Sequence, residues 1–243
     1  MIASFIIFGV GLILLTIFLI DKCHKYSVRA TFFKMLVSVC FVGVAVSGWF
    51  YSSKENINIF GIFIIMGLLF GLLGDILLDY KYVFREEDVV FTKLGFLVFG
   101  IGHIIYITGI FLCFTHFNNL EFIPWYYILI AFDIGIVSVV AVILLEKPMK
   151  NNYGKFKPIC LAYSFILFSM FGVSLCFAWY HEFTNWTLNF MTIGGILFVI
   201  SDLILSGTYF GVGKERPIDI VTNTVTYYLA QFFIAFSLLM LVF

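Results

Sequence analysis

Eight long apolar runs dominate the sequence and limit the folds open to it. Each is about 18–22 residues long, the length that an α-helix needs to cross a hydrocarbon layer of roughly 30 Å. The runs lie near residues 2–20, 34–51, 57–78, 94–114, 125–145, 159–180, 188–208 and 222–243. Only short polar segments separate them. We therefore expect an all-α membrane protein, a bundle of about eight transmembrane helices that forms one polytopic domain over residues 1–243.

The composition excludes two other classes of protein. Hydrophobic residues make up 63% of the chain and charged residues 12%, whereas soluble domains carry about 25% charged residues. This pool cannot build a soluble surface. The formal net charge is zero, so there is no basic surface for nucleic acid. The first run has no basic residue before it and no small-residue cleavage site, so we expect a retained helix rather than a signal peptide.

The basic residues predict how the chain is oriented. All 14 Lys and Arg residues except Lys54 fall in alternate loops or beside them, after the first, third, fifth and seventh runs. Cytoplasmic loops carry the excess of Lys and Arg in membrane proteins. We therefore expect an integral multi-pass protein with both termini on the non-cytoplasmic side.

Several ionisable and polar residues lie inside the apolar runs, where their transfer into the bilayer costs free energy. An ionisable side chain at the centre of a spanning helix costs about 2.5–3.5 kcal/mol even on insertion scales, so such residues often mark functional sites. With the predicted orientation, polar residues of five runs fall at one depth, in the cytoplasmic half of the membrane. They are Lys34, Asp75, His103, Asp202, Tyr228 and Gln231. Four more polar residues lie next to these or one helical turn away, namely Asp79, Tyr106, Ser201 and Tyr227. The alternative for any one of them is a polar contact that holds helices together, and for the isolated Asp133 this is at least as plausible.

The segments around the two deepest aspartates resemble each other. Residues 67–78 (GLLFGLLGDILL) align without gaps to residues 194–205 (GGILFVISDLIL), at an offset of 127 positions. The offset relates the third run to the seventh. The chain could therefore consist of two parallel four-helix repeats.

Several blocks together resemble the YhhN family of membrane lysoplasmalogenases over nearly the whole chain. They are Lys34 near the start of the second run, GDILL at Asp75, the stretch that ends in His103 and Tyr106, LFVISDLIL at Asp202, and YYLAQ at residues 227–231. Two positions depart from the family pattern, Met35 where proline is common and Asp79 where an apolar residue is usual.

The resemblance implies hydrolysis of the vinyl ether bond of lysoplasmalogens to a fatty aldehyde and glycerophosphoethanolamine or glycerophosphocholine. Such a bond is cleaved by protonating its β-carbon, after which water attacks the oxocarbenium ion. One neutral carboxylic acid and one carboxylate would serve, as in glycosidases. We expect Asp75 and Asp202 to be this pair, with their individual roles open.

The other polar residues of the cluster are the expected substrate-binding residues. Among them, His103, Tyr228 and Gln231 would orient water or the glycerol, and Lys34 would meet the phosphate. The pattern implies no metal and no cofactor. A proton-coupled transporter or lipid carrier is the alternative function, because buried acids also relay protons, and a purely structural membrane protein is a third. Head-group preference and oligomeric state stay open.

Overall fold

The computed structural model describes residues 1–24, 28–52, 59–117, 124–211 and 216–242. In this part of the chain, eight helices are long and apolar enough to cross a membrane. They are α1 (Ile2–His24), α2 (Val28–Ser52), α3 (Ile59–Val83), α4 (Asp88–Phe117), α5 (Trp125–Leu145), α6 (Lys157–Tyr180), α7 (Trp186–Phe210) and α8 (Pro217–Phe236). Short 3₁₀ turns lie at Arg85–Glu87, Gly154–Phe156 and Leu239–Val242. The predicted all-α bundle is confirmed.

Several helices extend beyond the apolar runs that predict them. The second helix begins at Val28 rather than at residue 34, so Lys34 lies in its second turn and does not open it. At its other end α3 continues to Val83 and includes Asp79 and Lys81. Hydropathy marks only the part of a helix inside the hydrocarbon, whereas helical hydrogen bonding continues into the polar interface. The charged residues at these helix ends therefore belong to the helices and not to the loops between them.

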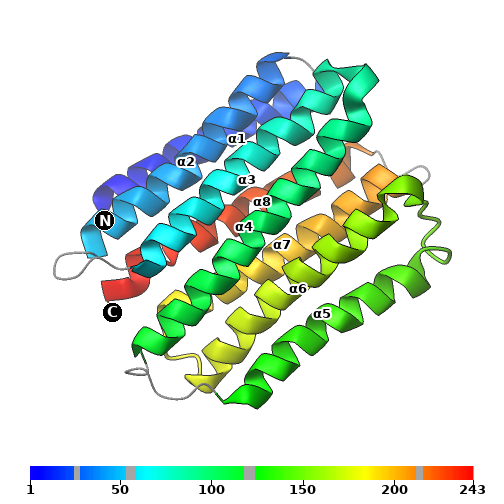
Figure 1. Ribbon diagram of the computed structural model, residues 1–243. Helices are drawn as coiled ribbons and strands as arrows, with labels where there is room; N and C mark the ends of the chain where they lie inside the picture. The colour runs from blue at the N-terminus through cyan, green and yellow to red at the C-terminus, as the bar shows by residue number, and fades with distance from the viewer. Residues whose placement is uncertain (25–27, 53–58, 118–123, 212–215, 243) are drawn as a thin grey trace.

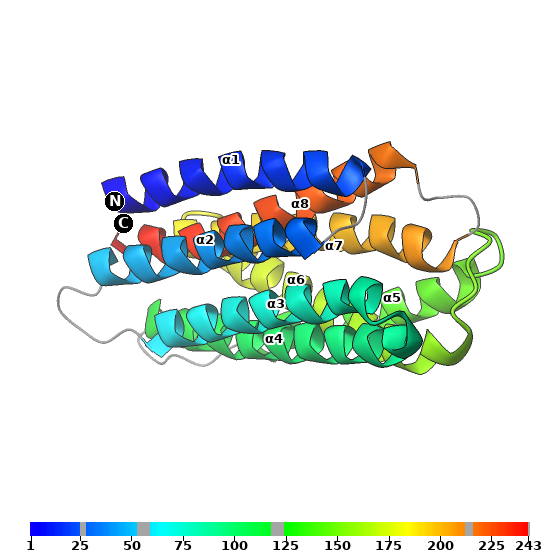
Figure 2. The same ribbon diagram turned by 90° about the horizontal axis from the view of Figure 1, so that it is seen from above.

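Six helices form a closed ring of contacts. Neighbours in the ring are α2 and α3, α3 and α4, α4 and α6, α6 and α7, α7 and α8, and α8 and α2. The remaining helices lie outside it, α1 against α2 and α8, and α5 against α6 (Figures 1 and 2). Each contact of the ring has a counterpart between the helices four places further along the chain. The contact of α2 with α3 corresponds to that of α6 with α7, α3 with α4 to α7 with α8, and α4 with α6 to α8 with α2. This pattern is the one that two parallel four-helix repeats, the arrangement suggested by the similar segments, would give.

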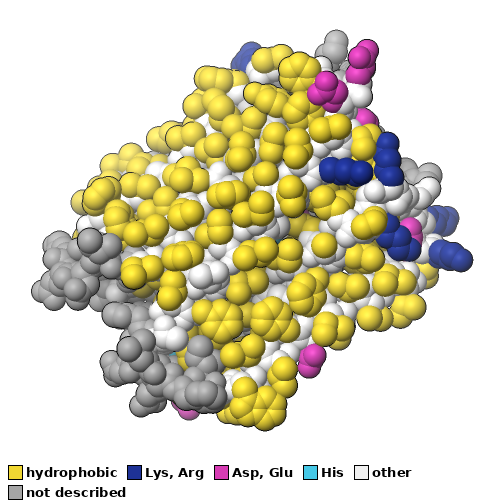
Figure 3. Space-filling model, in the orientation of Figure 1, with side chains coloured by type: hydrophobic (Ala, Val, Ile, Leu, Met, Phe, Trp, Pro, Cys, Tyr) yellow, Lys and Arg dark blue, Asp and Glu magenta, His cyan; other side chains and the backbone are white. Residues whose placement is uncertain are grey.

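The surface and the termini fit a membrane-spanning bundle. Hydrophobic side chains cover most of the face in Figure 3, and Lys and Arg side chains gather at one end of it. The N- and C-termini lie together at the other end (Figure 1), as an even number of spans requires. Lys54, the one basic residue predicted on the other side of the membrane, lies outside the described residues.

Candidate active site

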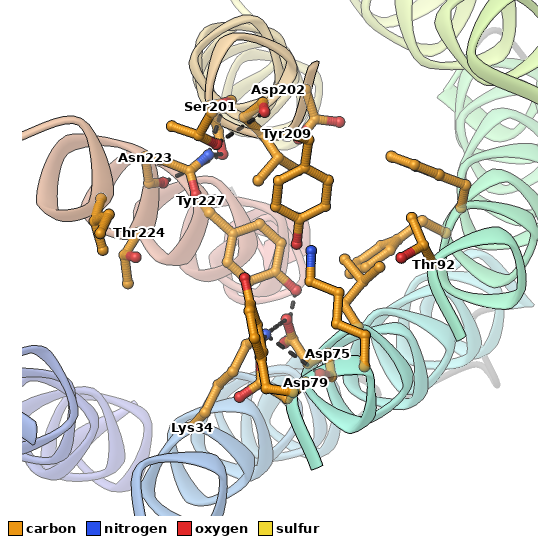
Figure 4. Close-up of a pocket in the computed structure, with 18 of the residues that line it drawn as sticks. Lys34, Asp75, Asp79, Thr92, Ser201, Asp202, Tyr209, Asn223, Thr224 and Tyr227 are labelled. Atoms are coloured by element: carbon orange, nitrogen blue, oxygen red, sulfur yellow. Dashed lines mark hydrogen bonds and ion pairs between the residues drawn. The ribbon is translucent and has the colours of Figure 1, made fainter. Parts of the chain in front are cut away.

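A cavity of about 670 Å³ opens among the six ring helices and α1, toward the end of the bundle that carries Lys22 of α1 and Lys81 of α3. Asp75 of α3 and Asp202 of α7 both line it. In Figure 4 the two aspartates lie on opposite sides of the cavity, and Tyr227 of α8 lies between them. The two acidic segments that the sequence singled out therefore meet at one cavity.

Asp75 is buried and held by hydrogen-bond donors from two neighbouring helices. Its Oδ2 accepts hydrogen bonds from Ser38 Oγ of α2 and from the Tyr227 hydroxyl, both at 2.7 Å. Its Oδ1 lies 3.4 Å from the Lys34 ammonium. Donors and a cation around a carboxyl group favour its ionised form. The polar groups around Asp75 are therefore ones that stabilise a carboxylate.

Lys34 is engaged mainly by the second acid of α3. Its Nζ lies 2.7 Å from Asp79 Oδ1 and also donates to the backbone carbonyl of Asp75 at 3.3 Å. Asp79 is buried, with 4% of its surface exposed. One lysine thus faces two carboxylates, which leaves this group of three side chains with a net charge of −1 when both acids are ionised.

Asp202 has a different set of neighbours. Its Oδ2 accepts a short hydrogen bond from the Tyr163 hydroxyl of α6. Behind this hydroxyl lies His103 of α4, with Nε2 3.3 Å from the Tyr163 oxygen. In the described part of the chain no cation lies within ion-pair distance of Asp202. Asp202 therefore lacks the charge compensation that Asp75 has.

The contacts of Tyr163 define the state of His103. Because the Tyr163 hydroxyl donates its proton to Asp202, its oxygen accepts from His103, which must carry hydrogen on Nε2. His103 Nδ1 is buried without a hydrogen-bond partner among the described residues. A neutral imidazole protonated on Nε2 satisfies both observations. His103, Tyr163 and Asp202 thus form a chain in which each proton points toward the aspartate.

A further set of polar residues supports the cavity wall without lining it. Tyr106 donates to Gln231 Oε1 at 3.2 Å, and Gln231 Nε2 donates to the Tyr227 oxygen at 3.1 Å. Both Tyr106 and Gln231 are almost fully buried. They orient Tyr227, whose own hydroxyl proton then points at Asp75.

Tyr228 and Ser201 connect helices beside the two acids. Tyr228 lines the cavity and donates to the Lys34 backbone carbonyl at 3.1 Å. Ser201 donates to the Asn223 carbonyl at 3.2 Å, and Asn223 Nδ2 donates back to the Ser201 carbonyl at 2.7 Å. This exchange fixes α7 against α8 next to Asp202.

The structure thus sorts the residues that the sequence predicts for the site. Those that line the cavity are Lys34, Asp75, Asp79, Ser201, Asp202, Tyr227 and Tyr228, whereas His103, Tyr106 and Gln231 lie behind it. Sequence reasoning did not find Ser38, Tyr163, Asn223, Lys81 and Tyr209. Tyr163 carries no signal that separates it from the other tyrosines in the apolar runs. A serine one turn after Lys34 was a signal for Ser38, because residues four apart share a helix face.

A second, apolar cavity of about 480 Å³ adjoins the first. It lies between α5, α6 and α7 and is lined mainly by aliphatic side chains, among them Ile134, Val137 and Leu167. Both cavities share Asp202, Tyr163, Phe96, Leu205 and Phe210 as lining residues. A polar chamber and an apolar groove therefore meet at the second aspartate.

The fold and the cavity define the class of this chain, an integral multi-pass helical protein with a buried pair of acids. A family model then identifies it more closely. The model of the YhhN family matches residues 29–238, and the chain belongs to this family. The match includes every predicted site residue. No curated protein and no solved structure matches the chain.

Proposed function

We propose that the protein is a lysoplasmalogenase, an ether hydrolase that cleaves the vinyl ether bond of lysophospholipids. The observation that carries the proposal is the pair of aspartates on opposite sides of one cavity, with different hydrogen-bond partners. Membership of the YhhN family fits a hydrolase of this kind. A carboxyl pair with unlike surroundings suits a reaction that needs an acid and a base at the same time.

The surroundings of the two acids suggest their roles. Asp75 receives two hydroxyl donors and faces Lys34, so it would be the carboxylate that takes a proton from water. Asp202 has no cation partner among the described residues, so it would be the neutral acid. Tyr163 and His103 would hold the Asp202 carboxyl group in position and would stabilise its carboxylate after it has given up its proton.

The reaction would then run as a closed proton cycle. Asp202 protonates the β-carbon of the vinyl ether, and the electron pair of the double bond forms the new C–H bond. Water attacks the resulting oxocarbenium carbon while Asp75 accepts its proton, which gives a hemiacetal. As the hemiacetal collapses, Asp75 returns its proton to the departing glycerol oxygen and the hemiacetal hydroxyl proton goes to Asp202. Both acids regain their starting states.

The apolar groove supports a lipid with a single long chain as substrate. Its volume of about 480 Å³ lies within the roughly 300–1,000 Å³ of typical ligand pockets. Because the groove meets the polar cavity at Asp202, an alkenyl chain in the groove would place its first carbons beside the proposed acid. The polar head would then occupy the larger cavity.

Hydrolysis in heavy water tests both the activity and the proposed mechanism. Purified protein should release an aldehyde from a 1-alkenyl lysophospholipid. In D₂O that aldehyde should carry one deuterium on the carbon next to the carbonyl, because the proton added to the β-carbon comes from an exchangeable acid. The aldehyde should be trapped as it forms to prevent later exchange. Release without this deuterium would contradict protonation at carbon.

A carrier function predicts a different result. Protein in liposomes would then move lipid or protons across the membrane and release no aldehyde. Such an outcome would replace the hydrolase by the proton-coupled carrier, in which the same aspartates relay protons.

A further inference from the structure

Lys81 is a lysine of the cavity wall that pairs with no carboxylate of the described residues. It projects from the last turns of α3, lines the cavity and is partly buried. Its Nζ lies 3.2 Å from the centre of the Tyr209 ring of α7. Among the described residues no carboxylate lies within ion-pair distance of this ammonium. A contact with an aromatic face, worth about 0.5–2 kcal/mol, places a cation without neutralising it.

The charges around Lys81 do not compensate it from further away. Two cations, Lys22 and Lys34, and two carboxylates, Asp79 and Asp88, act on it electrostatically. Their formal charges cancel, and Asp79 is already paired with Lys34. These four groups therefore do not neutralise the charge of a protonated Lys81. An uncompensated cation beneath a membrane surface is costly, and an anionic ligand would remove that cost.

The same comparison argues against Lys34 as the anion site. Lys34 lies between Asp75 and Asp79, so a phosphate that approached it would also approach two carboxylates. Its ammonium, 3.4 Å from Asp75 Oδ1, also favours the ionised form of Asp75 that a base requires. Lys34 therefore fits a role in the acid–base machinery better than the phosphate contact that the sequence suggests.

From this we infer that Lys81, against Tyr209, is the anion subsite that binds the phosphate of a lysophospholipid head group. The inference rests on the proposed function and adds the residue that selects phosphate-bearing substrates. Lys81 lies six residues after Asp75, or roughly 9 Å along the helix, and Tyr209 lies seven residues after Asp202, or roughly 10 Å. Along their own helices, the two residues of the subsite therefore lie at similar offsets from the two acids, toward the end of the bundle that carries Lys22 and Lys81.

Two substrates that differ only in the phosphate head group test the assignment kinetically. The first is a 1-alkenyl lysophosphatidylethanolamine and the second is the corresponding 1-alkenylglycerol. For Lys81→Gln we expect KM for the first to rise roughly 10- to 100-fold, as expected for loss of a charged hydrogen bond, with kcat within about twofold. The second substrate should be unaffected. Lys93→Gln, which removes an exposed lysine of α4 that does not line the cavity, is the matched control.

A KM that is unchanged, or that rises equally for both substrates, would overturn the subsite. Lys81→Arg keeps the charge and should recover most of the affinity, which a purely structural role of Lys81 would not predict. Correct folding of each variant is checked by its elution and thermal unfolding in detergent.

Binding of an uncleavable ligand separates this inference from the hydrolase itself. A 1-O-alkyl lysophosphatidylethanolamine should raise the unfolding temperature of the wild type, and Lys81→Gln should lose most of that increase. A 1-O-alkylglycerol should act equally on both proteins. If the wild type cleaves no vinyl ether but shows this Lys81-dependent binding, the proposed reaction fails and the subsite stands. If millimolar inorganic phosphate alone produces the same Lys81-dependent increase, the site binds free phosphate and the head-group assignment is wrong.

Discussion

At the scale of single residues, the two aspartates of the similar segments in α3 and α7 have different surroundings. Each acid accepts a hydrogen bond from a hydroxyl group of the helix that precedes its own in the chain. The donor is Ser38 of α2 for Asp75 and Tyr163 of α6 for Asp202. Among the residues that the structure describes, a lysine lies near Asp75 but none lies within ion-pair distance of Asp202. Identical carboxyl groups can therefore carry opposite proton-transfer roles, because neighbouring charge decides which form is stable.

Replacing either aspartate by asparagine should abolish most of the activity. Asp75→Asn and Asp202→Asn keep the side-chain shape but cannot exchange protons at neutral pH, so aldehyde release should fall by about 10²- to 10⁴-fold. Expression and elution in detergent should stay close to wild type. Asp219→Asn, which changes an acid at the start of α8 that does not line the cavity, is the control. An acid whose variant keeps more than about a tenth of the wild-type rate does not belong to the catalytic pair.

Tyr163→Phe tests the chain of hydrogen bonds behind Asp202. The substitution keeps the ring against Phe96 and His103 and removes only the hydroxyl that holds the carboxyl group. The hydroxyl would stabilise the carboxylate that forms as Asp202 gives up its proton, so its loss predicts a fall of kcat by roughly 10- to 100-fold, with little change in KM. Tyr180→Phe, at the far end of α6, should leave both constants near wild type. A variant that raises KM and leaves kcat unchanged would place Tyr163 in substrate binding instead.

At the scale of helices, close backbone contact holds the peripheral α5 against the ring. A Cβ added at Gly172 of α6 would lie 2.6 Å from the backbone oxygen of Ala131 of α5. Small residues at such crossings are a common means of helix packing in membranes. Gly9 of α1, in contrast, has nothing within 4 Å of the corresponding position. Replacement by alanine should therefore have opposite effects on stability at these two glycines.

Gly172→Ala should destabilise the protein, whereas Gly9→Ala should not. The first forces backbones apart and should cost about 1–3 kcal/mol. The second adds a methyl group in open space and should be neutral or favourable by up to about 1 kcal/mol, because glycine is a poor helix residue. Thermal unfolding in one detergent measures both variants. Equal stability of the two would mean that α5 does not pack on α6 as described.

The helices also show which parts of the site could be predicted from the sequence. Asp75 and Asp202 stand out because an acid in an apolar run is rare and expensive. Tyr163 does not stand out in a chain with 13 tyrosines and 32 phenylalanines. Lys81 follows its apolar run, where a lysine is typical of a cytoplasmic boundary. Only the packing of α3 against its neighbours shows that this lysine lines the cavity.

At the scale of the whole molecule, the cavity opens at the end of the bundle where the basic loops lie. The loop after α5 packs against the end of α7, where Asn152 donates to the Phe210 carbonyl at 2.8 Å. Phe156 of this loop region and Phe210 also line the cavity. The positive-inside rule predicts that this end faces the cytoplasm. The proposed substrate would then reach the acids from the inner leaflet.

Labelling in intact cells tests this orientation. A single cysteine introduced as Lys147→Cys, in the basic loop after α5, should react with a membrane-impermeant maleimide only after the cells are permeabilised. Epitope tags at both termini should be accessible without permeabilisation, because both termini lie at the opposite end of the bundle (Figure 1). The unmodified chain, with its five native cysteines, gives the background of the labelling. If Lys147→Cys is labelled from outside and both tags require permeabilisation, the bundle is inverted. The cavity would then open toward the outer leaflet, and the substrate would have to come from that side.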